Sequence, residues 1–355
     1  MKRSIPRLFS IFIVTLFVLI QANHLEVFGQ ELSTQLFNQG LSEYRAQQFD
    51  AALQSLQQAN VLFKEEADLR GESKTQSMMA TVYIAVGDYQ EAIRLSESAL
   101  LLAQKLEDRK LQIEIIGKLC ISQQSLGRYL AALQSYQQAL DIVKEEGNKP
   151  FEGHLLGLIG NTYASLGHYD LALTQHKKSL DIARQRNNAA ALTIVFGNIG
   201  TVYAYKGEFA QALDNHTLSL QFAREINDSE ENAYALNNLA SSYDALCDYA
   251  KALAYYQESM EIAQSMHLIS LEIEVMSNLG TLYGALDEYE QAIDLYEQSL
   301  AKAQAIRNPR ATATALNNLG HALFNSGQYA EAENRLRDAI AELEALRPTL
   351  NDNYN

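Results

Sequence analysis

The sequence predicts an all-α protein, a solenoid of eight antiparallel helix pairs over residues 31–350. When the chain is cut every forty residues from Glu31, it falls into eight blocks with no insertion or deletion up to Leu350. One position is aromatic in every block, and the residue three positions later is always alanine. Apolar residues also recur at helical spacing in each block. A fixed period of this kind is typical of repeats that pack on their neighbours in a row.

Four positions of the repeat keep their residue type. Two of them hold small residues, which allow helix axes to approach closely, while aromatic rings fill the wider gaps. The aromatic column is Phe49, Tyr89, Tyr129, Tyr169, Phe209, Tyr249, Tyr289 and Tyr329, and the alanine column is Ala52, Ala92, Ala132, Ala172, Ala212, Ala252, Ala292 and Ala332. The small columns are Ala59, Ala99, Ala139, Ser179, Ser219, Ser259, Ser299, Ala339 and Gly40, Ala80, Cys120, Gly160, Gly200, Ala240, Gly280, Gly320.

Each block is predicted to be a helix, a tight turn, a longer helix and a linker. Glycines at 87, 127, 167, 207 and 327 suit a left-handed residue that ends the first helix. Asp88 followed by Glu91 resembles a capping box that opens the second helix. Pro150 and Pro309 fall at block boundaries, where a helix interior is not interrupted.

The predicted domain organisation follows the period. One helix pair cannot bury both of its apolar stripes alone, so the array is the folding unit. The units are 31–70, 71–110, 111–150, 151–190, 191–230, 231–270, 271–310 and 311–350, with a tail at 351–355.

The first thirty residues differ from the repeats. Lys2, Arg3 and Arg7 precede Leu8–Ile20, an apolar run that is short for a membrane span and well sized for a signal peptide. We expect residues 1–29 to be a signal peptide cleaved near Gly29, which predicts an exported protein, periplasmic or secreted. The alternative is a membrane anchor formed by residues 8–20.

Charge limits the class of partner. The formal net charge is -15, and a surface this acidic repels phosphate backbones and anionic lipid. We therefore expect no nucleic-acid partner and no docking on a membrane surface beyond the N-terminal segment. The expected partners are neutral or basic proteins or peptides.

The sequence shows no catalytic constellation, so we expect no enzyme, no cofactor and no metal site. HExxH, CxxC, GxSxG and phosphate-loop motifs are absent. His176 and His216 occupy equivalent positions in adjacent repeats, but without a third ligand they favour packing over metal binding. Cys120 and Cys247 lie three units apart, too far for a disulfide, and are expected to be small buried residues.

The repeat resembles the tetratricopeptide repeat in a 40-residue form. The Leu-Gly pair of that family is matched by Leu279-Gly280 and Leu319-Gly320, and its first-helix tyrosine by Tyr83, Tyr163, Tyr203, Tyr243 and Tyr283. The early tryptophan and the closing proline of the family are absent. The resemblance implies a right-handed superhelix whose first helices line a concave groove that binds a protein or peptide.

The groove positions carried over from the family hold small residues, amides and hydroxyls, which suit an extended peptide. Asparagine offers both a donor and an acceptor to a bound backbone. The alternative is that these small residues only permit tight packing. The predicted binding residues are Ser77, Thr81, Asn161, Thr201, Asn237, Ser241, Ser277, Thr281, Asn317 and His321.

The last predicted helix, 330–346, has an apolar stripe with no later repeat to cover it. It is expected to be an interface, for self-association or for a domain missing from this chain. The tail also resembles the junction between such repeats and a caspase-like CHAT protease domain in bacterial, often cyanobacterial, proteins. The sequence thus predicts a non-catalytic exported scaffold that binds a protein or peptide in its groove. The alternative is the sensing portion of a CHAT-type protease whose catalytic domain is missing from this chain.

Overall fold

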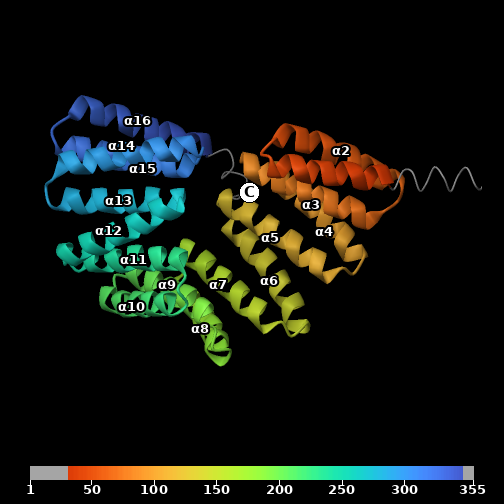
Figure 1. Ribbon diagram of the computed structural model, residues 1–355, viewed down its shortest axis with the longest axis horizontal. Coiled ribbons are helices and arrows are strands. Elements are labelled where there is room, and N and C mark those ends of the chain that lie inside the picture. Colours follow the sequence, from red (N-terminus) through yellow and green to blue (C-terminus); the bar gives the residue numbers. More distant parts are fainter. Residues whose placement is uncertain (1–30, 347–355) are drawn as a thin grey trace, which may run out of the picture. The chain divides into compact units, whose positions relative to one another are not determined.

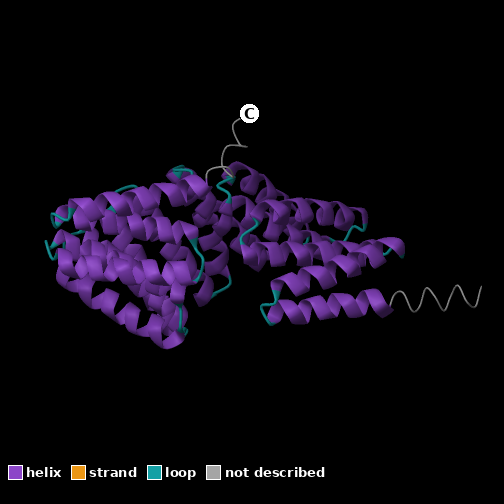
Figure 2. Ribbon diagram, turned by 90° about the horizontal axis from the view of Figure 1, so that it is seen from above, coloured by secondary structure: helices purple, strands orange, loops and turns teal. Residues whose placement is uncertain are grey.

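The computed structural model describes residues 31–346, and these residues form helices and short turns without a β-strand, which confirms the all-α fold class (Figure 2). The predicted signal peptide, the alternative anchor and the tail at 351–355 lie outside the described residues. No helix within 31–346 is both long enough and apolar enough to cross a bilayer.

A new helix begins every twenty residues. A first helix covers residues 31–45 and the others follow at equal intervals (Figure 1). They are α2 (Phe49–Glu65), α3 (Leu69–Val86), α4 (Tyr89–Lys105), α5 (Arg109–Ser125), α6 (Tyr129–Glu145), α7 (Lys149–Ser165), α8 (Tyr169–Gln185), α9 (Ala189–Tyr205), α10 (Phe209–Glu225), α11 (Ser229–Ala245), α12 (Tyr249–Met266), α13 (Ile269–Ala285), α14 (Tyr289–Ala305), α15 (Pro309–Asn325) and α16 (Tyr329–Leu346). The expectation of a longer second helix and a linker was wrong, because both connections are equally short turns.

Every turn between described helices contains one left-handed residue at the same relative position. The glycines predicted to end the first helices adopt this conformation, with φ of 84° at Gly87 as an example, and Gly147 does so as well. Nine turns use another residue type, which the sequence did not indicate. These residues are Gln47, Ala67, Glu107, Asn187, Asn227, Cys247, His267, Asp287 and Arg307.

The turn between α3 and α4 shows how the helix ends are satisfied. Gly87 N–H donates to the Ile84 carbonyl at 3.1 Å, and Asp88 N–H donates to the Tyr83 carbonyl at 2.9 Å. The Asp88 carboxylate accepts from Glu91 N–H at 3.1 Å and so caps α4 as predicted. The Glu91 side chain pairs with Arg94 instead of returning to Asp88, so only half of the predicted capping box forms.

The described helices form two compact units. Unit 1 ends at Ile142 and unit 2 begins at Val143, so the boundary lies within α6. In unit 1, α3 packs between α2 and α4, and α4 packs on α5. In unit 2, each helix from α7 to α16 packs on the next helix in the chain. The odd-numbered helices of unit 2 also lie beside one another, α7 beside α9 and so on to α15.

In five helix pairs a glycine of the first helix faces a larger residue of the second helix. These glycines are Gly40, Gly160, Gly200, Gly280 and Gly320. A Cβ added to Gly160 would lie only 2.6 Å from Cε1 of His176. A Cβ on Gly280 would meet the ring of Tyr296 at 2.7 Å. The eight alanines of the alanine column are also buried, so both columns serve close helix packing.

The two cysteines differ in environment. Cys120 belongs to the small column and is fully buried, as expected. Cys247 is exposed, and the expectation that it is buried was wrong. It occupies the left-handed turn position after α11, with φ of 60°, where the twenty-residue spacing places it outside the packed helices.

The prediction that His176 and His216 serve packing agrees with their burial. Their exposed fractions are 0% and 3%. His216 Nδ1 lies 2.7 Å from Ser242 Oγ, whereas neither ring nitrogen of His176 has a hydrogen-bond partner. Burial lowers the pKa of both histidines to about 4, because the charged ring would lose its hydration.

Two glycines of unit 1 give opposite expectations for the same substitution. A Cβ at Gly87 or at Gly117 would meet no atom within 4 Å, so only the backbone conformation differs. Gly87→Ala should lower the free energy of unfolding by about 1 kcal/mol, because alanine resists the left-handed region. Gly117→Ala, inside α5, should raise it by about 0.5–1 kcal/mol. Urea denaturation of both variants measures the change in the free energy of unfolding. A change of the same sign in both variants would contradict the left-handed conformation of Gly87.

The buried histidines predict a loss of stability in mild acid. Unfolded histidines titrate near pH 6.5, so the unfolded chain binds more protons between pH 6.5 and 4. The stabilisation is therefore complete above pH 6.5 and falls as the pH drops toward 4. We expect each histidine to cost about 2 kcal/mol at pH 5 relative to pH 7.5. Urea denaturation at both pH values of the double variant His176→Phe/His216→Phe should show a smaller loss than the unmodified chain. The exposed His321→Gln variant is the control.

Candidate functional site

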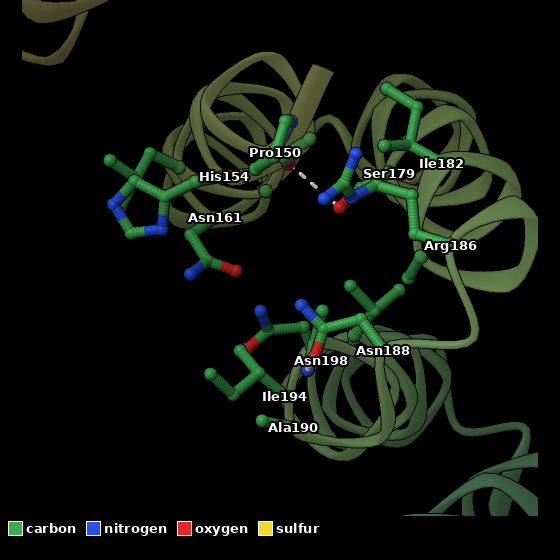
Figure 3. A pocket seen from close by; sticks show the side chains of 16 residues that line it. Pro150, His154, Asn161, Ser179, Ile182, Arg186, Asn188, Ala190, Ile194 and Asn198 are labelled. Carbon is green, nitrogen blue, oxygen red and sulfur yellow. Dashed lines mark hydrogen bonds between the residues drawn. The ribbon is translucent and has the colours of Figure 1, made fainter. Parts of the chain in front are cut away.

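The exposed side of α7, α9, α11, α13 and α15 in unit 2, here called the odd-helix face, contains three neighbouring hollows. The first hollow, of about 320 Å³, lies among α7, α8 and α9 (Figure 3). The second hollow, of about 440 Å³, lies between α7 and α9. The third, of about 270 Å³, lies among α9, α10 and α11. Shared lining residues join the three hollows into one continuous surface.

Two asparagines connect the hollows. Asn198 lines all three, and Asn161 lines the first and the second. Figure 3 shows both side chains at the first hollow, Asn161 from α7 and Asn198 from α9. Neither side chain is hydrogen-bonded to another described residue. Each amide is therefore free to donate to, and accept from, the backbone of a ligand.

The predicted binding residues differ in exposure. Asn161, Ser241, Thr281, Asn317 and His321 are exposed, Thr81, Thr201 and Ser277 are half-buried, and Ser77 and Asn237 are buried. Asn161 and Thr201 meet at the second hollow. Ser77 and Thr81 belong to unit 1 and the other eight residues to unit 2, so the ten residues do not define one site. Their part in binding stays a prediction.

Several of the predicted hydroxyls are already used within the protein. Thr81, Thr201 and Thr281 each donate to the carbonyl four residues earlier, at 3.0 to 3.1 Å. Ser77, which is 1% exposed, accepts a hydrogen bond from Lys118 Nζ at 2.6 Å. The amides of Asn161 and Asn198, by contrast, keep their hydrogen-bonding capacity for a ligand.

Asn237 is the centre of a polar network between α11 and α13. Its exposed fraction is 1%, and its amide nitrogen donates to Glu274 Oε1 at 2.8 Å. Its amide oxygen accepts from Asn278 Nδ2 at 3.0 Å. The network holds Glu274 at the odd-helix face, so Asn237 acts here by positioning its neighbours.

Negative charge gathers around Tyr234 at the third hollow. Burial, and then the nearby Glu230, Glu274 and Glu231, raise the pKa of the Tyr234 phenol. Burial also raises the pKa of Glu231 and of Glu274. None of these glutamates forms an ion pair with another described residue, so this part of the face is electronegative.

The described residues contain no group of three or more His, Cys, Asp or Glu side chains arranged to hold a metal ion.

The apolar residues along α16 differ in burial. Ala332 and Ala339 are buried, whereas Ile340 and Leu343 are exposed. The interface at this helix stays a prediction.

Sequence models of the tetratricopeptide repeat match residues 77–110, 111–185, 189–265 and 271–344, which together are more than half of the chain. The chain belongs to the tetratricopeptide repeat family. A comparison with curated proteins finds no match.

Solved structures share the fold of this tetratricopeptide repeat protein at low identity. The Rap conjugation gene regulator of plasmid pLS20, in complex with the Phr* peptide, is 15% identical with a TM-score of 0.63, over 89% of this chain and 96% of that one. A tetratricopeptide repeat protein from Parabacteroides merdae is 16% identical with a TM-score of 0.60, over 81% and 100%. A STAND protein with a tetratricopeptide repeat sensor from Pyrococcus horikoshii is 19% identical with a TM-score of 0.55, over 90% of this chain and 49% of that chain.

Asn198 and Arg186 are among the lining residues that the sequence prediction missed. Asn198 stands one position after Gly197, in the same column as Asn238, Asn278 and Asn318, and that column was a signal that could have found it. Arg186 follows α8, a second helix of its pair, and it reaches the odd-helix face only because the turn brings it there. No periodic signal marked it.

The Asn237 network predicts unequal effects for the same substitution at equivalent positions. Asn237→Ala should lower the free energy of unfolding by about 1–2 kcal/mol, because Glu274 and Asn278 each lose their hydrogen bond to the buried Asn237 amide. Asn317→Ala, four helices later and exposed, should change it by less than about 0.5 kcal/mol. Urea denaturation of both variants measures the difference, and similar losses would show that the network contributes nothing specific.

Proposed function

We propose that this chain is a non-catalytic exported scaffold that binds an extended segment of a protein or peptide on the odd-helix face of unit 2. One observation carries the proposal: three hollows lie in a continuous row and are joined by the unbonded amides of Asn161 and Asn198. An extended backbone has unpaired N–H and C=O groups, and amide side chains satisfy both kinds.

Two glycines on the odd-helix face support an extended ligand. Gly157 lines the first hollow and Gly197 the third, so a backbone can approach α7 and α9 closely. The Rap regulator of plasmid pLS20, which has a similar fold, was solved with a peptide bound. This likeness gives the proposal a precedent within the fold.

Charge narrows the class of ligand to neutral or basic segments. The unpaired Glu230, Glu231 and Glu274 surround Tyr234 at the third hollow, and the whole chain is acidic. A basic side chain placed beside Tyr234 would neutralise these carboxylates, whereas an acidic segment would be repelled.

Export and the wider context of the scaffold are part of the same proposal. Export rests on the basic and apolar pattern of residues 1–29, with an anchor at residues 8–20 as the alternative. The sensing portion of a CHAT-type protease is the second candidate. It is favoured by the exposed Ile340 and Leu343 on α16, which suit contact with a further domain or a second copy.

A charged obstacle in the row of hollows should abolish binding. We expect the double variant Asn161→Arg/Asn198→Arg to lose about tenfold or more in affinity for neutral and basic members of a fluorescently labelled peptide library. The new side chains would fill the first and second hollows and repel a basic segment. Fluorescence anisotropy measures the affinity.

The control is Gln298→Arg, which makes a similar change at an exposed position of α14. It should leave the affinity unchanged. Equal affinity of the double variant and the unmodified chain would assign these asparagines to packing alone, and a preference for acidic peptides would contradict the charge argument.

A further inference from the structure

The first hollow lies beside two glycines of α7. Gly153 and Gly157 lie one helical turn apart and both line it. The positions equivalent to Gly153 in the other described repeats hold Ser33, Ser73, Ile113, Thr193, Ala233, Ile273 and Ala313, so glycine at this position occurs in this repeat alone. A Cβ on Gly157 would approach only Ser179 Oγ, at 3.9 Å, which shows that the space beside it is open.

The lining of this hollow is mainly apolar and has a single charged group. Ile182 and Ala183 contribute from α8, and Ile194 and Val195 from α9. No aspartate or glutamate lines it. His154 also lines the hollow, and burial lowers the pKa of its ring below the ordinary value. Arg186 is therefore the one formal charge of the lining, in a chain whose net charge is -15.

Arg186 is not explained by the fold. It forms no ion pair with any residue between 31 and 346, and its side chain is exposed. Figure 3 shows this side chain among those that line the hollow. A packing role would predict similar residues in the other repeats, yet none of them is a cation. The equivalent residues are Glu66, Leu106, Glu146, Ile226, Met266, Ile306 and Leu346.

A second donor lies close to Arg186 in the chain. The Asn188 side chain lines the same hollow, and its Oδ1 accepts from Ala191 N–H at 3.1 Å. This bond leaves the Asn188 NH₂ group as a donor. A guanidinium and an amide NH₂ at the edge of an apolar space match the two oxygens of a carboxylate attached to an apolar body. A volume of about 320 Å³ is in the range of small-molecule sites.

We propose that the first hollow binds a small apolar carboxylate, with the carboxylate paired to Arg186 and the apolar body between α8 and α9. This inference goes beyond the proposed scaffold function and does not rest on it. A small carboxylate could occupy the first hollow whether or not a peptide binds on the odd-helix face. Occupation of the hollow would cover Asn161 and Asn198, so such a ligand would also compete with a segment on the odd-helix face.

The test uses N-acetyl-L-leucine, with N-acetyl-L-leucinamide as the uncharged control and acetate as the control without an apolar body. We expect saturable binding of N-acetyl-L-leucine to the full chain in calorimetric titration, and at least about tenfold weaker binding of both controls. With the isoleucine methyl groups labelled for NMR, the signals of Ile182 and Ile194 should shift, and that of the distant Ile293 should not.

Three variants locate the site. Arg186→Gln should weaken N-acetyl-L-leucine binding by about tenfold or more, because it removes a charge-assisted pair. Arg224→Gln removes an arginine of α10 that is ion-paired with Glu258 at 3.1 Å, and it should leave binding unchanged. Gly157→Leu should fill the hollow and abolish binding without lowering the melting temperature, because leucine favours a helix and the new Cβ meets open space.

The outcomes separate this inference from the scaffold proposal. Equal binding of the acid and its amide, or an Arg186→Gln variant with unchanged affinity, would overturn the carboxylate site. Binding of peptides alone, with no binding of N-acetyl-L-leucine, would also overturn it and would leave the scaffold proposal intact. Binding of N-acetyl-L-leucine by a chain that binds no library peptide would support the site and count against the scaffold.

Discussion

The structure depends on close packing within the helix pairs, where a small residue of the first helix lets the second helix approach. Where glycine occupies the small position, as at Gly160, Gly200 and Gly280, an added methyl group would overlap the facing ring. The ring can change between histidine and tyrosine because the space requires volume more than a particular polarity. In this way the helix axes stay close enough to bury the alanine column, while the opposite sides of the helices are free to vary.

The left-handed turn residues impose a second constraint, that of equal helix length. Each turn reverses the chain within three residues, and each helix begins twenty residues after the last. The geometry is so uniform that residues as different as Ala67, Glu107 and Arg307 adopt the conformation that glycine adopts elsewhere. Packing on both sides of the turn compensates for the cost of that conformation, which is why residue type alone did not reveal these positions.

Polar side chains with unused hydrogen-bonding groups lie on the odd-helix face, outside the closely packed contacts between paired helices. On the odd-helix face the helices meet at their small residues, and the asparagines between them are divided into two roles. Asn237 is enclosed and holds Glu274, whereas Asn161 and Asn198 have unused hydrogen-bonding groups beside open hollows. The same kind of residue therefore supports the scaffold at one repeat and faces solvent at another. Burial of the neighbouring side chains makes the difference.

The sequence by itself determined the helical class, the family, the position of the glycine turns and the burial of the alanine column, because these features repeat and each repeat is a separate instance of the same packing problem. It also indicated the face on which Asn161 and Thr201 meet. Only the tertiary structure decided that Asn237 is buried, that Cys247 is exposed at a turn, and that Arg186 lines a hollow made by Gly153 and Gly157. These features are specific to one repeat, and they depend on which side chains of neighbouring helices and turns meet in space.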